Sequence, residues 1–316
     1  MRMFLKGALA VSLLLSCAPA AAPRAQTAQR GVRAEDYYAF EFLGDPRLSP
    51  DGRWVAYVVT TVDQRQNRRL SQIWLAPSDG GRPPRQFTTS PQSSASPRWS
   101  PDGRTLAFIS TRPAPDGGPP AQQGSATPTP APSPTAAPSP TPSGTETTPG
   151  LPSALQTAPA EATPRAQVWA LSLDGGEARR LTNLKNGVNT FDWSPDGARM
   201  VLTSRTGPSD VKPPSSDVRH YKHTSYKFND TGWFDDKRSH LWVLDVRSGA
   251  ASQITSGEDW NDTDPQWSPD GNLIAFVSDR TGRAFDESRN TDVFVVAPAG
   301  GPVRKISDHE EADNTP

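Results

Sequence analysis

The chain has one cysteine, Cys17, among its 316 residues. A single thiol excludes an internal disulfide and leaves no cysteine pair for a zinc site. Its 33 basic and 34 acidic residues give a formal net charge of -1, so no strong net field favours nucleic acid or an anionic membrane as a partner. Stability must therefore come from packing, and nucleic-acid binding is set aside.

Long hydrophobic runs are also lacking, apart from one short run near the N-terminus. Arg2 and Lys6 precede an apolar stretch from Ala8 to Leu15, which is too short to span a membrane as a helix. A basic start followed by a short apolar segment is typical of a signal peptide. We therefore predict a signal peptide over residues 1–22, no transmembrane segment, and export to the periplasm or the extracellular space.

Two processing routes compete at this signal peptide. Leu14 to Cys17 resembles a bacterial lipobox, which makes Cys17 the candidate for lipidation and the protein a candidate for anchoring to the envelope. Ala18 to Ala22 instead offers the small residues that ordinary signal peptidase prefers. The second route is favoured, because Leu15 is atypical at its lipobox position.

Four copies of Ser-Pro-Asp-Gly divide the rest of the chain into repeat units. They begin at Ser49, Ser100, Ser194 and Ser268, at intervals of 51, 94 and 74 residues. Proline fixes φ at the first corner of a turn, aspartate bonds to the backbone that follows, and glycine accepts a positive φ. Each copy therefore predicts a tight turn between two strands.

Each turn is followed by a short apolar strand and then by a second strand pair. Trp99, Trp193 and Trp267 precede three of the turns, and Leu48 takes that place in the first. Four short strands per unit, with a period of roughly 50 residues, are typical of β-propeller blades. We predict an all-β propeller of four blades plus a partial one, forming an incomplete ring, with the aromatic residues packed between blades.

The longer intervals predict insertions between the second and third strands of the second and third units. Residues 113–165 hold 15 prolines and only four charged residues, a composition that predicts a disordered tether. Residues 206–238 carry five aromatic residues, which favours a packed loop or an added hairpin. The predicted organisation is thus a signal peptide (1–22), propeller (34–112), disordered insertion (113–165) and propeller cut off within a blade (166–316).

Three clusters of titratable residues are candidates for metal or substrate sites, but a structural role is favoured for each. His220, Lys222 and His223 form the densest cluster, but a metal needs three or four convergent ligands and Lys222 is cationic. Asp235, Asp236, Asp259, Asp262 and Asp264 match no calcium loop, and aspartate is common in turns. Glu310 and Glu311 are read as surface charge. No metal or other cofactor is predicted.

Beyond the repeated turn, which TolB-like propellers also have, two segments carry a resemblance to a known family. They are residues 35–48, with Glu35, Asp36, Tyr37 and Tyr38, and residues 232–242, which include Arg238 and His240. With them, the chain from Ala34 to Pro316 resembles the N-terminal region of S9 (prolyl oligopeptidase) family peptidases, in the acylaminoacyl-peptidase-like branch. Arg238 and His240 either face an interdomain cavity or lead into the next strand, and neither is ranked as a site residue.

The resemblance implies a propeller that caps a C-terminal α/β-hydrolase domain and admits short peptides to a Ser-Asp-His triad. The sequence has no Gly-x-Ser-x-Gly elbow, so no catalytic residue carries over. We therefore expect the substrate-gating portion of an exported serine peptidase, with the chain stopping before its hydrolase domain. Two alternatives stay open: a TolB-like propeller that binds another envelope protein without catalysis, and a lipid-anchored interaction domain tethered through Cys17.

Overall fold

The computed structural model describes residues 30–113, 164–212, 215–216, 218, 221, 226–228, 232–281, 290–307, 311–313 and 316. The chain separates into two compact parts, residues 1–37 and 38–316. Of the first part, the structure describes the residues from Arg30 onward. There Arg30 Nη1 donates to Asp36 over 2.7 Å at the start of the 3₁₀ helix η1 (Ala34–Ala39).

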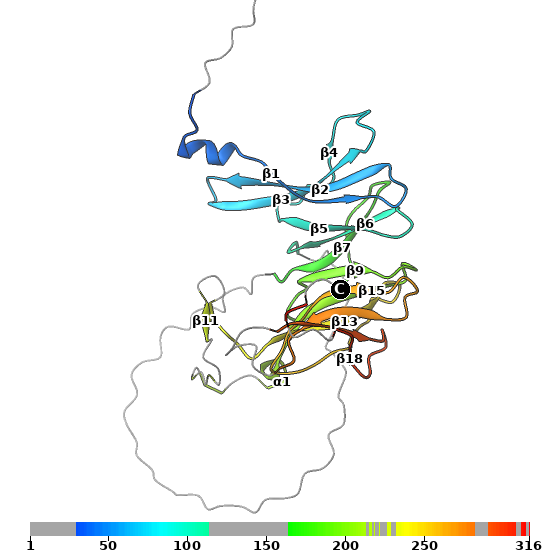
Figure 1. Ribbon diagram of the computed structural model, residues 1–316. Helices are drawn as coiled ribbons and strands as arrows, with labels where there is room; N and C mark the ends of the chain where they lie inside the picture. Colours follow the sequence, from blue (N-terminus) through cyan, green and yellow to red (C-terminus); the bar gives the residue numbers. More distant parts are fainter. Residues whose placement is uncertain are drawn as a thin grey trace, which may run out of the picture. The chain divides into compact units, whose positions relative to one another are not determined.

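The second part contains four antiparallel four-stranded sheets, which Figure 1 shows in sequence order from blue to red. The first sheet contains β1 (Phe42–Leu48), β2 (Trp54–Asp63), β3 (Arg68–Pro77) and β4 (Arg85–Gln86). The second contains β5 (Ser94–Trp99), β6 (Thr105–Ser110), β7 (Gln167–Ser172) and β8 (Arg179–Arg180). These sheets confirm the predicted strand pairing in the first two units.

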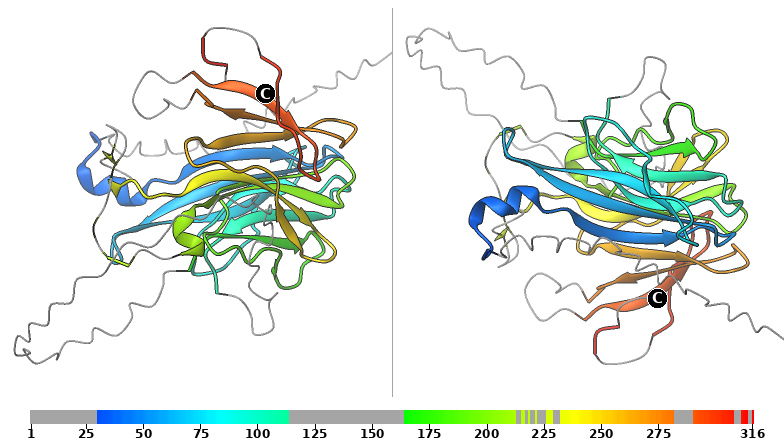
Figure 2. Two further views of the ribbon diagram at one scale, coloured as in Figure 1. Left: turned by 90° about the horizontal axis from the view of Figure 1, so that it is seen from below. Right: turned by 90° about the horizontal axis from the view of Figure 1, so that it is seen from above.

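The third sheet contains β9 (Thr190–Trp193), β10 (Arg199–Thr206), β13 (Arg238–Asp245) and β14 (Ala251–Gln253). The fourth contains β15 (Asp262–Trp267), β16 (Ile274–Ser278), β17 (Asp292–Val296) and β18 (Arg304–Lys305). In both views of Figure 2 the fourth sheet, in orange and red, lies at one side of the other three. The all-β propeller fold is thus confirmed, and the described residues after β18 form no further strand.

Both long intervals fall between the second and third strands of a sheet, as the repeat spacing predicts. β6 pairs with β7 across the first, and β10 pairs with β13 across the second. The Pro-rich insertion lies almost entirely outside the described residues, as does the signal segment 1–22 with Cys17. The second interval carries the short helix α1 (Pro208–Val211) and a hairpin of β11 (Lys227–Phe228) with β12 (Gly232–Trp233), so the added hairpin is confirmed.

The Ser-Pro-Asp-Gly turns have the geometry their residues predict. In the first turn Ser49 Oγ donates to Asp51 over 2.6 Å, while Gly52 N–H donates to the Ser49 carbonyl over 2.9 Å. Gly52 and its three equivalents have φ of 68° to 70°, a region that glycine adopts without a steric penalty. The serine hydrogen bond lowers the pKa of the turn aspartate in every copy, to about 2 for Asp270.

A second repeated contact is a hydrogen bond between a Thr or Ser hydroxyl and the backbone of the third strand of each sheet. In the first sheet the Thr88 hydroxyl accepts the Ile73 N–H over 2.9 Å and donates to Gln72 over 2.6 Å. The corresponding hydroxyls of the other sheets accept an N–H at 2.9 or 3.0 Å; they belong to Thr182, Thr255 and Ser307. A side chain thereby satisfies one strand donor where the short fourth strand has ended.

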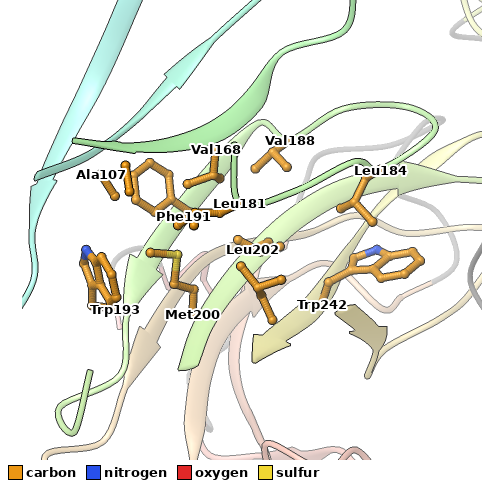
Figure 3. Close-up of a cluster of buried hydrophobic side chains, with 12 residues drawn as sticks. Ala107, Val168, Leu181, Leu184, Val188, Phe191, Trp193, Met200, Leu202 and Trp242 are labelled. Carbon is orange, nitrogen blue, oxygen red and sulfur yellow. The ribbon is translucent and has the colours of Figure 1, made fainter. Parts of the chain in front are cut away.

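The middle sheets are buried on both faces, so alternate residues of one strand enter different cores. On β6, Leu106 and Phe108 pack toward the first sheet, whereas Ala107 packs toward the third. On β10, Met200 and Leu202 face the second sheet and Val201 faces the fourth. Figure 3 shows the core between the second and third sheets, with Trp193 and Phe191 toward one end of the cluster and Trp242 at the other.

The tryptophans before the turns pack between sheets, as predicted. Trp99 and Trp193 are buried, and each indole N–H donates to a carbonyl of the preceding sheet, Arg47 at 2.9 Å and Arg98 at 3.2 Å. Trp267 packs against the core of the third and fourth sheets. Among the described residues these cores join neighbouring sheets, and none joins the fourth sheet to the first.

Candidate functional site

Three charged or titratable side chains meet where the third and fourth sheets adjoin. His240 lies on β13, Asp262 opens β15, and Arg280 follows β16. His240 is 2% exposed and Asp262 is 0% exposed. The imidazole Nδ1 lies 3.3 Å from one carboxylate oxygen of Asp262, and Arg280 donates to the other over 2.9 Å.

The hydrogen bonds of His240 exclude a general-base role for it in this arrangement. Its Nε2 lies 2.9 Å from the Gly257 carbonyl oxygen, which can only accept, so Nε2 carries a proton and donates. The histidine of a hydrolase triad instead leaves Nε2 facing a nucleophilic hydroxyl. His240 and Asp262 therefore look like two thirds of a triad but form a structural contact between sheets.

Asp262 corrects one prediction made from the sequence. The five aspartates from Asp235 to Asp264 were interpreted as turn residues, but Asp262 is wholly buried and binds side chains. Burial by itself would raise its pKa, but hydrogen bonds from His240 and Thr255 and the charge of Arg280 hold the pKa below its usual value. The carboxylate is therefore ionised and lies against the buried His240 and the partly exposed Arg280.

Asp235 and Asp236 have the predicted turn and loop roles. Asp235 accepts the Lys237 N–H over 3.0 Å, and Asp236 accepts the Ser209 N–H at the start of α1 over 2.7 Å. Lys237 Nζ donates to Asp210 of the same helix over 2.8 Å. These contacts attach α1 to the segment that leads into β13, so they position the loop.

Arg238 starts β13 and is partly buried. Its Nη1 donates to the carbonyls of Asp235 and Lys237, both over 2.9 Å. Burial is the largest cause that lowers its pKa, the nearby Arg205 adds to it, and the carboxylates of Asp235 and Asp259 oppose it. Arg238 and His240 thus both lie within β13, and His240 is inaccessible to a ligand.

The hairpin of the second insertion presents aromatic side chains. The rings of Tyr221 and Trp233 lie 5.9 Å apart between centroids, and Tyr226 lies 5.5 Å from Tyr221. Lys227 Nζ lies 5.0 Å from the centre of the Trp233 ring. Tyr226 and Trp233 are each 48% exposed, so part of this cluster faces solvent.

Several predicted positions lie outside the described residues. These are Cys17, His220, Lys222, His223 and Glu310. Asp259, Asp264 and Glu311 are described and exposed. Within the described ranges no three His, Cys, Asp or Glu side chains gather as a metal site requires, and no helix there is long and apolar enough to cross a membrane.

Sequence reasoning missed two arginines that lie over aromatic rings. Arg280 lies 5.0 Å from the centres of the Trp260 and Phe294 rings, and Arg112 lies 4.9 Å from that of Phe108 and 5.2 Å from that of Trp169. The available signal is a repeated Ser-x-Arg after the second strand, at Ser110 and Ser278. Such stacking stabilises a partly desolvated cation.

The chain is similar in sequence to peptidases and in fold to the propeller region of a solved peptidase structure. No family model matches the chain. The uncharacterized peptidase YuxL of Bacillus subtilis is 29% identical over 273 residues, which cover 84% of this chain and 34% of that protein. Dipeptidyl-peptidase 5 of Porphyromonas endodontalis is 23% identical over 295 residues, covering 86% of this chain and 34% of that protein.

A solved structure with the same fold is the uncomplexed acylaminoacyl peptidase of Pyrococcus horikoshii, with a TM-score of 0.56, 18% identity, and coverage of 86% of this chain and 33% of that one. The fold is that of a propeller region. With the peptidase relatives, these matches confirm the predicted resemblance to the N-terminal propeller region of S9 family peptidases. The chain spans about a third of the length of these curated relatives, because the matched residues make up 34% of each relative.

Proposed function

We propose that this chain is the substrate-gating propeller portion of an exported S9 family serine peptidase that hydrolyses short peptides. The observation that carries the proposal is the match over 84% of this chain to a peptidase and over 86% to a dipeptidyl-peptidase. Both matches take in about the same share of a longer protein, 34%. Catalytic residues would then lie in an α/β-hydrolase domain outside this chain.

Gating requires sheets that keep their positions, and the described contacts are of that kind. The core between each pair of neighbouring sheets is tightly packed and buried, and such interiors resist deformation. Hydrogen bonds from the indoles of Trp99 and Trp193 join the first strands of adjacent sheets. A wall of this rigidity would exclude folded proteins and admit short, extended peptides.

The test uses the complete product of the gene that encodes this chain. Its kcat/KM is measured on acylated and free dipeptide and tripeptide amides, on peptides of about 20 residues, and on an unfolded protein. We expect hydrolysis of the short substrates, inhibition by a serine-directed fluorophosphonate, and a steep fall with length. Hydrolysis without a length limit would remove the gating role, and no hydrolysis of any substrate would remove the peptidase assignment.

The TolB-like alternative makes the opposite prediction for the same preparation. A binding module gives no fluorophosphonate labelling and instead copurifies with a defined envelope protein after cross-linking in cells. No specific contact in the described residues favours this alternative. It becomes the better proposal if the coding sequence beyond Pro316 carries no hydrolase domain.

Export and anchoring form a separate part of the proposal. The basic residues Arg2 and Lys6 before the short apolar run support export. Cell fractionation should place the protein in the periplasm or the medium, and metabolic labelling with a fatty acid should fail if signal peptidase cleaves after Ala22. Labelling that disappears in Cys17→Ser would instead establish a lipid anchor.

A further inference from the structure

Arg112 and Arg280 hold corresponding positions in the second and fourth sheets. Each follows by two residues the serine that ends the second strand, Ser110 or Ser278. Each guanidinium lies over an aromatic ring of the second strand and one of the third. Each sheet thus places an arginine over a pair of aromatic rings, and this arrangement is called the cation seat below.

The group that completes this seat differs between the two sheets. In the fourth sheet Asp262 pairs with Ser278 across the ladder, and Arg280 Nη2 donates to its carboxylate over 2.9 Å. In the second sheet Ser94 occupies that register opposite Ser110, and Arg112 Nη2 donates to its hydroxyl over the same distance, 2.9 Å. A neutral hydroxyl therefore stands where the fourth sheet has a carboxylate.

Arg112 is consequently a cation without a counter-charge among the residues that the structure describes. Among the described residues its side-chain hydrogen bonds go to Ser94 and Ser110, and no carboxylate forms an ion pair with it. Burial lowers the pKa of its guanidinium, as expected when desolvation is not offset by a negative neighbour. Its Nη1 donates no hydrogen bond within the same described set.

A second donor beside Arg112 also lacks an acceptor. The Trp169 side chain is 1% exposed, and its indole N–H has no hydrogen-bond partner among the described residues. A buried donor without an acceptor is energetically unfavourable. The Trp242 indole N–H of the third sheet likewise has no partner among the described residues. The third sheet has Thr206 at the position of Arg112, so the uncompensated charge distinguishes the second sheet.

We propose that Arg112, supported by Ser94, is a binding site for the carboxylate of a peptide. The fourth sheet shows which group the seat accepts, since Asp262 supplies it there. A planar carboxylate fits the guanidinium fork and would use the free Nη1 together with Nη2. The inference rests on the proposed peptidase function only for its choice of a peptide as the carrier of the carboxylate.

The test follows the Arg112 Nε–Hε resonance in the ¹⁵N-labelled 316-residue chain, assigned with Arg112→Lys. Three peptides are titrated: acetyl-Ala-Ala-Ala with a free C-terminus, its C-terminal amide, and acetyl-Ala-Glu-Ala amide. Free acetate is titrated separately. We expect saturable shifts with both acidic peptides and at least about tenfold weaker binding of the neutral amide, which corresponds to about 1.4 kcal/mol. The two acidic peptides distinguish a C-terminal carboxylate from a side-chain one.

Two variants and one internal control make the result specific. Ser94→Asp copies the fourth sheet and should abolish peptide binding while Arg112 is retained. Arg112→Gln should do the same by removing the charge, and it covers the case in which Ser94→Asp does not fold. The Arg280 resonance, already paired with Asp262, should not shift with any peptide.

Three outcomes would overturn the proposal. One is equal binding of the neutral amide, and another is unchanged binding in Ser94→Asp and Arg112→Gln. The third is binding of acetate with no tighter binding of either acidic peptide, which would reject the peptide as the carrier. Because this chain is tested without any hydrolysis, a negative result here leaves the hydrolysis experiment on the complete gene product unaffected.

Discussion

The junction of the first and second sheets and the junction of the third and fourth sheets use the same positions in different ways. At the first, Gln72 and Ser94 are neutral, and the ion pair between Arg98 and Asp45 that joins the two sheets is partly exposed. At the second, His240 takes the place of Gln72 and Asp262 that of Ser94, and both contact each other. One junction is therefore held mainly by packing, and the other adds a buried charged network.

This difference teaches that the repeat specifies a backbone and leaves the polar contacts of each junction free to change. The registers that place Gln72 opposite Val59 and His240 opposite Ser204 are equivalent. A buried charged network depends on every member, because removing one leaves the others uncompensated. The third-fourth junction should therefore be more sensitive to single substitutions and to pH.

The largest effect is expected for Asp262→Asn. The change leaves the buried His240 and the partly exposed Arg280 without their carboxylate, which should cost about 3–5 kcal/mol. Urea unfolding followed by far-UV circular dichroism measures it. Asp264→Asn is the matched control, since Asp264 is exposed and asparagine tolerates its φ of 48°. An equal loss in both variants would contradict the buried network.

Protonation of Asp262 in acid should gradually remove the stabilisation that its carboxylate provides. The resulting loss of unfolding free energy should be no larger than that of Asp262→Asn. The folded-state pKa of Asp262 lies below its unfolded value, so its stabilisation is complete above about pH 4 and is lost as the pH falls through the folded value. The difference in unfolding free energy between the native chain and Asp262→Asn should therefore shrink below about pH 4. A difference that stays constant between pH 7 and pH 2 would sink the assignment.

Gly257→Ala should give an intermediate effect at the same junction. Gly257 has φ of 154°, and an added Cβ would clash with the Trp260 ring, while its carbonyl accepts from His240. Displacing that ring should cost about 1–3 kcal/mol, measured by thermal unfolding. Gly301→Ala, with φ of 113° and open space around it, isolates the backbone cost and should lose less.

The smallest effect is expected when the indole N–H is removed at each of the two junctions and the losses of stability are compared. Trp99→Phe removes a 2.9 Å hydrogen bond to the Arg47 carbonyl, whereas the Trp267 indole N–H has no partner among the described residues. Trp99→Phe should therefore cost about 0.5–1.5 kcal/mol more than Trp267→Phe. Equal losses would mean that ring volume alone matters at both junctions.

Much of the fold was predictable because its signals are local. The four Ser-Pro-Asp-Gly turns predict four strand pairs, and the structure has a hairpin at each. Strand ends were less predictable: one interpretation of the sequence placed Arg238 and His240 before the next strand, but that strand runs from Arg238 to Asp245. Its polar ends gave no hydrophobic signal, and pairing with β10 extends it.

The polar contacts were not predictable from local pattern. Asp262 looked like one more turn aspartate, yet its partners His240 and Arg280 lie 22 and 18 residues away in sequence. Likewise, the repeated Ser-x-Arg marks the position of Arg112 in the repeat but does not tell whether its guanidinium has a carboxylate partner. Whether such a side chain is buried depends on which residues the neighbouring sheet brings to it.

The sequence by itself thus determined the turns, the strand pattern and the place of both insertions, because each depends on backbone conformations that proline, aspartate and glycine impose within four residues. Tertiary structure alone decided which polar groups meet between sheets. Stacking two sheets brings residues from separate strands into one low-dielectric space, where charge and hydrogen-bond balance become decisive. Asp262 acquires its partners only there, and Arg112 is left without a carboxylate only there.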